Sequence, residues 1–340
     1  MHPDLNIYKN EYQNNLRMVD KNNVKYFEDY FSFIKDTTNF TVVNFSDYLI
    51  SDISDIVVVD STIFVLDLRS TTIHKIDLAT KTSVEFIPRG RGPGDVFSPT
   101  NMVVIGDTLV VADRINGFIT YTTDGTHIST THPGYSVDYF CILNNEMYIK
   151  SLYIIQDDKP SKYLIYKLDN EFNISESYGL RYPHDNNQIS AQLSMGKLIC
   201  NSEFGMIINS YVYGTPVVEL FMPDQNKIEA LIFNDNNPLL LEIINDIPVI
   251  SEINRGREIH LYSNASFIDN RFFIIQYEFR KAGNFSDTEL VSYLYCLKNR
   301  SLYISKEIPI IKWASDDYLL YEKPNQNDSY ILSSYSINEY

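Results

Sequence analysis

The residues whose types and spacing best suit binding chemistry lie in one short segment, Arg89-Gly90-Arg91-Gly92-Pro93-Gly94-Asp95. Its two arginines carry planar, permanently charged guanidinium groups that can pair with a carboxylate or a phosphate. Its glycines and its proline set a sharp backbone path. The glycines either cradle a phosphate or only form a tight turn. No helix-starting pattern follows them, as a P-loop or a dinucleotide-binding motif would require, and this favours the turn.

Other polar residues end or follow neighbouring strand-like runs, and we expect their loops to share one face with this segment. Arginines beside tyrosines suit a small anionic or carbohydrate-like ligand, or a peptide. In the structural alternative, the two arginines of the segment pair with loop acids such as Asp67 or Asp113. The predicted ligand-binding set is Arg89, Arg91, Arg69, Arg114, Asn116, Tyr153 and His184.

A repeated pattern positions these residues. In its clearest copy, strand-like runs cover residues 102–105, 108–113, 118–121 and 127–129, and Asp124-Gly125 joins the last two. Asp-Gly between alternating runs predicts a hairpin, because both turn residues tolerate positive φ. Six copies spaced by about 40–50 residues or more predict an all-β, six-bladed β-propeller of four-stranded antiparallel blades. The second strands are predicted to begin at Ile63, Leu109, Met147, Met206, Phe272 and Tyr318.

The two ends of the chain support the same fold. The sixth copy stops after its third strand, and residues 40–45 form a spare strand before the first copy. Pairing this strand with residues 330–336 would close the ring. We therefore expect an N-terminal extension over residues 1–38 and the propeller over residues 39–340.

Two helices are also predicted. Val24, Phe27, Phe31 and Ile34 recur at helical spacing, which predicts an amphipathic helix over residues 22–35. It would pack on the propeller rim or, alternatively, dock a partner protein, making the chain a scaffold. An insertion near residues 234–265 contains an apolar run at 238–244 that predicts a second, short helix.

Composition narrows the partners. A net charge of −16 without a basic stripe argues against nucleic acid and anionic membranes. No apolar run reaches transmembrane length, and no export signal is visible, although a chain trimmed of its signal would look the same. The widely spaced Cys141, Cys200 and Cys296 indicate no zinc site and do not require a disulfide. We expect a monomer that binds a small molecule, a protein or a peptide.

Two motifs carry a family resemblance. Residues 111–121, Val-Ala-Asp-Arg-Ile-Asn-Gly-Phe-Ile-Thr-Tyr, followed by Asp124-Gly125, resemble an NHL repeat. The segment 89–95 is similar to the Gly-Arg-Gly-Pro-Gly-Glu signature of a bacterial six-bladed β-propeller family related to NHL proteins, with Asp95 in place of Glu. Gly117-Phe118 also departs from the NHL pattern, which prefers an arginine before the apolar residue. The resemblance covers the first two blades and implies an exported or lipid-anchored bacterial protein.

Catalysis has weaker support, and no catalytic residue is predicted. Propeller lactonases and amidating lyases hold calcium or zinc with acidic, Asn or His side chains, so a metal-dependent hydrolase or lyase is the alternative function. Asp67 and Asp113 are the alternative metal ligands, because their oxygens suit Ca²⁺. They equally suit the capping of turns. We expect no cofactor, with calcium as the alternative.

Overall fold

The computed structural model describes most of the chain, and the regular secondary structure of these residues is nearly all β-strand. Its helices there are α2 (Asn187–Leu193) and the short 3-10 helices η3 (Phe27–Asp29), η4 (Phe45–Tyr48) and η5 (Pro223–Gln225). None is long and apolar enough to cross a bilayer. The described residues are 16–20, 24–156, 159–182, 186–210, 217–225, 227–234, 241–244, 247–250, 258–281, 284–315, 317–323 and 329–340.

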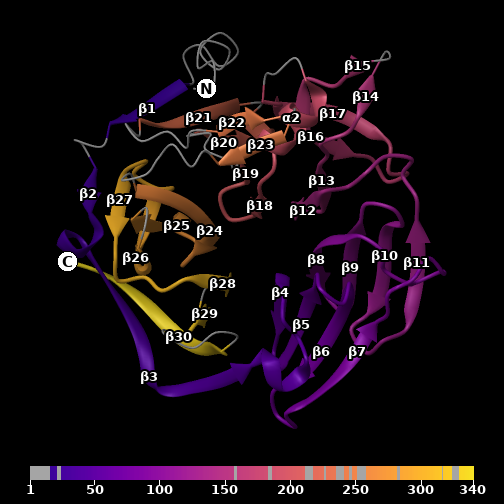
Figure 1. Ribbon diagram of the computed structural model, residues 1–340, viewed down its shortest axis with the longest axis horizontal. Helices are drawn as coiled ribbons and strands as arrows, with labels where there is room; N and C mark the ends of the chain where they lie inside the picture. The colour runs from indigo at the N-terminus through magenta and orange to yellow at the C-terminus, as the bar shows by residue number, and fades with distance from the viewer. Residues whose placement is uncertain are drawn as a thin grey trace. The chain divides into compact units, whose positions relative to one another are not determined.

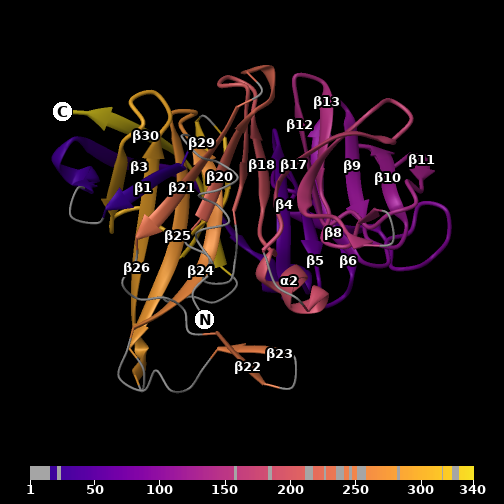
Figure 2. The ribbon, with the colours of Figure 1, turned by 90° about the horizontal axis from the view of Figure 1, so that it is seen from above.

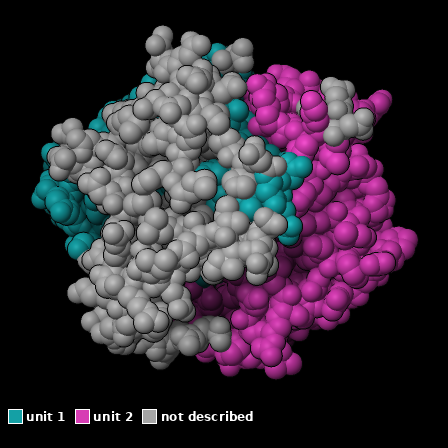
Figure 3. Space-filling view, turned by 45° about the horizontal axis from the view of Figure 1, so that its top comes forward, with its two compact units in different colours: residues 1–40, 179–321, 332–340 teal, residues 41–178, 322–331 magenta. Residues whose placement is uncertain are grey.

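The chain forms two compact units, which Figure 3 shows in different colours. Unit 1 takes residues 1–40, 179–321 and 332–340, and unit 2 takes residues 41–178 and 322–331. Most strands of each sheet follow one another in the sequence, and β1, β2 and β3 are the exceptions.

Unit 2 contains three four-stranded antiparallel sheets (Figure 1). The first is β4 (Ile53–Val59), β5 (Thr62–Asp67), β6 (Thr72–Asp77) and β7 (Thr82–Ile87). The second is β8 (Pro99–Ile105), β9 (Thr108–Asp113), β10 (Gly117–Thr122) and β11 (His127–Thr131). The third is β12 (Tyr139–Leu143), β13 (Glu146–Lys150), β16 (Tyr163–Leu168) and β17 (Ile174–Leu180).

The second sheet shows why its strands read as continuous apolar runs. Side chains alternate between the two faces of a strand. On β9, Val111 joins a buried cluster with Phe64 of the first sheet, whereas Val110 and Ala112 join another with Phe140 of the third. Because both faces of this strand are buried, neither set of positions can be polar.

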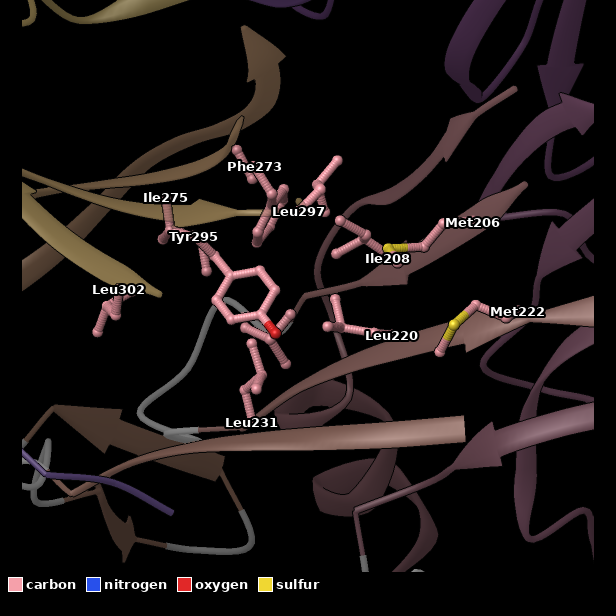
Figure 4. Close-up of a cluster of buried hydrophobic side chains, with 12 residues drawn as sticks. Met206, Ile208, Leu220, Met222, Leu231, Phe273, Ile275, Tyr295, Leu297 and Leu302 are labelled. Carbon is pink, nitrogen blue, oxygen red and sulfur yellow. The ribbon is translucent and has the colours of Figure 1, made fainter. Parts of the chain in front are cut away.

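Unit 1 contains two sheets with an added parallel strand each. One is β18 (Leu198–Asn201), β19 (Met206–Asn209), β20 (Val217–Met222) and β21 (Lys227–Asn234), edged by β1 (Leu16–Asp20). The other is β24 (Glu258–Ile268), β25 (Phe272–Lys281), β26 (Asn284–Cys296) and β27 (Leu302–Ser305), edged by β2 (Lys25–Tyr26). Between them lies a buried cluster in which Leu220 and Ile208 face Phe273 and Tyr295 (Figure 4).

The sixth sheet joins the two ends of the chain. Its order is β28 (Ile311–Ala314), β29 (Tyr318–Glu322), β30 (Ser329–Glu339) and β3 (Phe31–Asn44). The Ser329 hydroxyl donates to Asn44 Oδ1 (2.7 Å), and the Ser333 hydroxyl donates to the Asp36 carbonyl (2.8 Å). The predicted pairing of an N-terminal strand with the last strand is therefore confirmed. With six such sheets the fold is a six-bladed β-propeller, as the repeat predicted.

The amphipathic helix predicted over residues 22–35 is wrong. Its described residues, 24–35, include β2, the single turn η3 and the start of β3, which runs through the predicted domain boundary at residue 38. Phe31 and Phe33 are buried while Ile34 is 47% exposed, which is the alternation of a strand. Aromatic residues pack well on a pleated surface, and pairing with a neighbouring strand overrides the helical spacing.

The second predicted helix is also wrong where the structure describes it. Residues 241–244 form β22 (Leu241–Ile244), which pairs with β23 (Ile247–Ile250) in a hairpin, seen in Figure 2. Isoleucines stiffen the chain at χ1 and favour this extended form. The remainder of the apolar run, 238–240, lies outside the described residues.

Candidate functional site

Several loops of unit 2 come together at one end of its sheets. In an antiparallel sheet the turn between the second and third strands and the connection from the fourth strand to the next sheet lie at the same end. The Asn116 side-chain amide confirms this, because it donates to the Asp95 carbonyl (2.9 Å) in the connection after β7. We call this end the loop face, which comprises residues 45–52, 67–72, 88–98, 113–117, 132–138, 150–156 and 159–163.

The segment Arg89–Asp95 is a tight turn on the loop face. The Gly90 amide donates to the Val96 carbonyl (2.8 Å), and the Gly92 amide donates to Asp95 Oδ2 (3.0 Å). A Cβ on Gly90 would overlap the Asp95 carboxylate. Gly94 has φ +91° and lies against the Tyr121 hydroxyl, which donates to its carbonyl (2.9 Å). These contacts support the turn interpretation of the glycines.

The two arginines of the turn are held by an aromatic ring. Both are exposed, and their guanidinium carbons lie 5.8 Å (Arg89) and 4.3 Å (Arg91) from the centre of the Phe97 ring. A guanidinium near an aromatic face gains cation–π stabilisation and keeps its N–H donors free. Within the described part of the chain, neither guanidinium has an ion-pair or hydrogen-bond partner.

The acids that the structural alternative pairs with these arginines bind backbone and hydroxyl groups instead. Asp113 is fully buried, and its Oδ2 accepts the backbone N–H groups of Phe97 and Ser98, both at 2.7 Å. Its Oδ1 accepts those of Ile115 and Asn116, both at 2.8 Å. One carboxylate thus ties the entry of the second blade to the turn after β9.

Asp67 has the equivalent position in the first blade. It is buried, and its Oδ1 accepts the N–H groups of Asp52 (3.0 Å) and Arg69 (3.2 Å), while its Oδ2 accepts the Ser70 hydroxyl (2.8 Å). This supports the turn-capping interpretation of both aspartates, since a cation would compete with these donors. Among the described residues, no group of three His, Cys, Asp or Glu side chains is placed to hold a metal ion.

Arg114 belongs to a different arrangement. Its Nε donates to Oδ1 of the buried Asp138 (2.7 Å), whose Oδ2 accepts the Leu152 amide (2.8 Å). This ion pair links the second and third blades. Asp138 was absent from the predicted set. The available signal was an acid directly before the first strand of the third repeat.

Tyr139 follows this aspartate and is half-buried. Burial, together with the nearby carboxylates of Asp55 and Asp138, raises its pKa to about 12, although Arg114 opposes the shift. The phenol is therefore protonated at neutral pH.

Ser151 stands where the first two blades have their capping aspartate, and within the described residues its buried hydroxyl has no hydrogen-bond partner.

The remaining predicted residues are less closely associated. Arg69 is exposed in the turn that Asp67 caps, and Tyr153 is 52% exposed in the loop after β13. Both lie on the loop face. The structure brings Arg89 and Arg91 together over Phe97, with Asn116 supporting their turn. His184 lies outside the described residues.

Comparisons with known proteins identify a fold rather than an activity. No family model matches the sequence, and no curated protein matches it. A solved structure from Bacteroides fragilis NCTC 9343, named "Putative exported protein", is similar with a TM-score of 0.57 and 12% identity, covering 95% of this chain and 99% of that chain. Hydrazine synthase from Kuenenia stuttgartiensis has a TM-score of 0.48 and 10% identity, covering 85% of this chain and 76% of that chain.

The first of these likenesses shows a shared propeller fold along nearly the whole chain. At 12% identity it says nothing about shared chemistry. The relation to NHL proteins stays a prediction, because no family model matches. A rigid set of blades with irregular loops at one end is, in general, a scaffold for binding or interaction.

Proposed function

We propose that this protein is a non-catalytic binding propeller that recognises an anionic group through Arg89 and Arg91. The observation that carries the proposal is that both exposed guanidinium groups lie over Phe97 without a carboxylate partner among the described residues. Such a pair presents several N–H donors in fixed planes, which suits the oxygens of a carboxylate or a phosphate.

The turn that carries the arginines is already ordered. Asn116, the Asp95 carboxylate and the Tyr121 hydroxyl all bind its backbone. An anion would therefore meet cations whose main chain needs no further ordering, and this reduces the entropy cost of binding. A carbohydrate-like ligand or a peptide carrying an acidic group fits the same donors, with Tyr153 as an exposed aromatic surface on the loop face.

The other two functions have less support. A metal-dependent hydrolase or lyase of the lactonase type would need Asp67 and Asp113 as ligands, and both carboxylates are bound to backbone N–H groups. A scaffold that docks its partner through a helix at residues 22–35 loses its docking element, because this segment is mainly β-strand.

We also propose that the protein is exported. The name printed for the similar Bacteroides structure supports this. Cys141 and Cys200 are each disulfide-bonded, and disulfides persist mainly in oxidising compartments.

The proposal is tested by titrating the full chain with inorganic phosphate and with citrate in a calorimeter at low salt. Replacing both arginines with alanine is expected to weaken binding roughly 10- to 100-fold, since a hydrogen bond to a charged group contributes about 1.5–3 kcal/mol. Arg91→Lys should recover only part of the loss, because an ammonium cannot bind two oxygens with one planar fork.

Lys298→Ala is the matched control, because Lys298 is an exposed cation in a turn of unit 1. It should bind both anions like the wild type. Unfolding temperatures of all variants separate lost binding from lost folding. Equal affinity of the wild type and the double alanine variant for both anions would refute the proposal.

A further inference from the structure

We propose that the loop face docks an acidic polypeptide segment that carries apolar side chains. This inference rests on the proposed anion site and names the class of partner for it. Three observations support it: a repeated arrangement of turn side chains, an apolar extension on the third blade, and three exposed arginines on a strongly acidic chain.

The capping aspartates fix which side chains project from the loop face. Because Asp67 and Asp113 bind the backbone of the turns that follow them, the first two residues of each turn stay outside the core. In the first blade these are Leu68, 45% exposed, and the exposed Arg69. In the second they are Arg114, with 41% of its side chain exposed, and Ile115, 55% exposed. Each turn therefore presents one aliphatic and one cationic side chain.

The third blade extends this surface. Its loop after β13 contains the exposed Tyr153 and also Ile155, which is 69% exposed at the start of β14 (Ile155–Gln156). The same loop carries the exposed Lys159 and Lys162, in and just after β15 (Lys159–Pro160). Large apolar side chains left in water beside cations across several loops are typical of an interaction surface.

Charge indicates the kind of partner. The chain carries a net charge of −16, yet Arg69, Arg89 and Arg91 are exposed together on this face. Several acids there are engaged, because Asp67 and Asp113 cap turns and Asp138 binds Arg114, while Asp47 and Asp52 are exposed. Asp95 binds the Gly92 amide. Asp157 and Asp158 lie outside the described residues.

A polypeptide fits this surface better than a small anion alone. Arg89 and Arg91 can hold one acidic group, but that group would leave Ile115, Tyr153 and Ile155 in water. An acidic segment with apolar residues would pair with the arginines and cover the apolar side chains. A nucleic acid, with a negative charge on every nucleotide, would be repelled more strongly by the chain's overall charge.

The test is a selection of random peptides displayed on phage against the full wild-type chain, counter-selected against the Arg89→Ala, Arg91→Ala variant. Enriched sequences should contain Asp or Glu together with Leu, Ile, Phe or Tyr. The most enriched peptide is then synthesised with a fluorophore, and its affinity is measured by anisotropy. Tyr153→Ser and Ile115→Ser should each weaken it roughly tenfold, as central apolar contacts do in interfaces.

Ile128→Ser is the control, because Ile128 is 52% exposed on β11 and outside the loop face. It should not change peptide affinity. A selection that enriches no acidic, apolar sequences, or a peptide whose affinity Tyr153→Ser and Ile115→Ser leave unchanged, would overturn this inference. If phosphate and citrate still lose affinity in the double arginine variant, the anion site stands and only the peptide partner is wrong. Tighter binding of a labelled DNA oligonucleotide than of the peptide would also overturn the inference.

Discussion

At the scale of single residues, the central fact is how one aspartate is used. Asp113 was predicted either to bind a cation or to cap a turn, and the sequence alone left both open. The structure surrounds its two oxygens with four backbone N–H groups. Four backbone donors satisfy the acceptor atoms of this buried carboxylate without a metal. Its role is therefore to fix the turn from which Arg114 and Ile115 project.

Replacing Asp113 with alanine is expected to lower the free energy of unfolding by roughly 3–5 kcal/mol, because four buried N–H groups lose their acceptor. The free energy of unfolding of Asp113→Asn should lie between those of the wild type and Asp113→Ala, since an amide retains one acceptor oxygen. Ser151→Ala is the contrasting change: its hydroxyl is buried without a partner among the described residues, so its loss should leave stability unchanged or raise it by about 1 kcal/mol.

Urea unfolding followed by tryptophan fluorescence measures all three variants, with and without calcium. If calcium stabilised the wild type but not Asp113→Asn, Asp113 would be a metal ligand after all. If Asp113→Ala unfolded like the wild type, the capping role would be refuted.

Individual residues also show the limit of sequence reasoning at the site. Gly90 and Gly94 could be assigned to a turn because no helix-starting pattern follows them, as a phosphate-binding loop would require. The partner of Arg114 could not be found, because Asp138 is distant in sequence and meets it only when two blades pack together. The stacking of two arginines on Phe97 likewise depends on how the turn folds back.

At the scale of elements, strands were predicted well and helices were not. Alternation marks a strand whichever partner it meets, so β5, β9 and β13 appear where the repeat placed them. The helix predicted over residues 22–35 is wrong because the spacing of Phe27, Phe31 and Ile34 also fits a helical period. A cluster of buried aromatic rings favours the strand over the helix. The centroid of the Phe31 ring lies 5.1 Å from that of Phe272 and 5.2 Å from that of Tyr303.

The strand assignment makes a prediction that a helix would not. Phe31→Ala and Phe33→Ala should both destabilise the protein, Phe31→Ala by roughly 3–5 kcal/mol because it opens a cavity among aromatic rings. Ile34→Ala should change stability by less than about 0.5 kcal/mol, because Ile34 is mostly exposed. An amphipathic helix would reverse the order of Phe33 and Ile34. Thermal unfolding by circular dichroism compares the three variants directly.

At the scale of the whole molecule, the fold was predictable and the ligand was not. Six copies of one pattern, with a spare strand at one end and a missing strand at the other, permit few arrangements besides a closed propeller. The pairing of β3 with β30 bears this out. The choice of ligand depends on a few exposed side chains, and the fold is compatible with many residue types at those positions. A structural neighbour with 12% identity therefore does not indicate which ligand is bound.

The oxidation state of the three cysteines should indicate the compartment in which the protein works. Cys141 and Cys200 are disulfide-bonded, and Cys296 is a free, buried thiol. We predict that the chain, isolated without reductant and unfolded, reacts with a thiol reagent only at Cys296. After reduction, all three cysteines should react.

The variant Cys296→Ser should show no reactive thiol before reduction, which assigns the signal. In a reducing cytosol both bonded cysteines would be kept as thiols, so reactivity of all three in freshly isolated protein would argue against export. A single reactive thiol in protein recovered from the cell envelope would place the loop face in a compartment where secreted or surface polypeptides can reach its arginines.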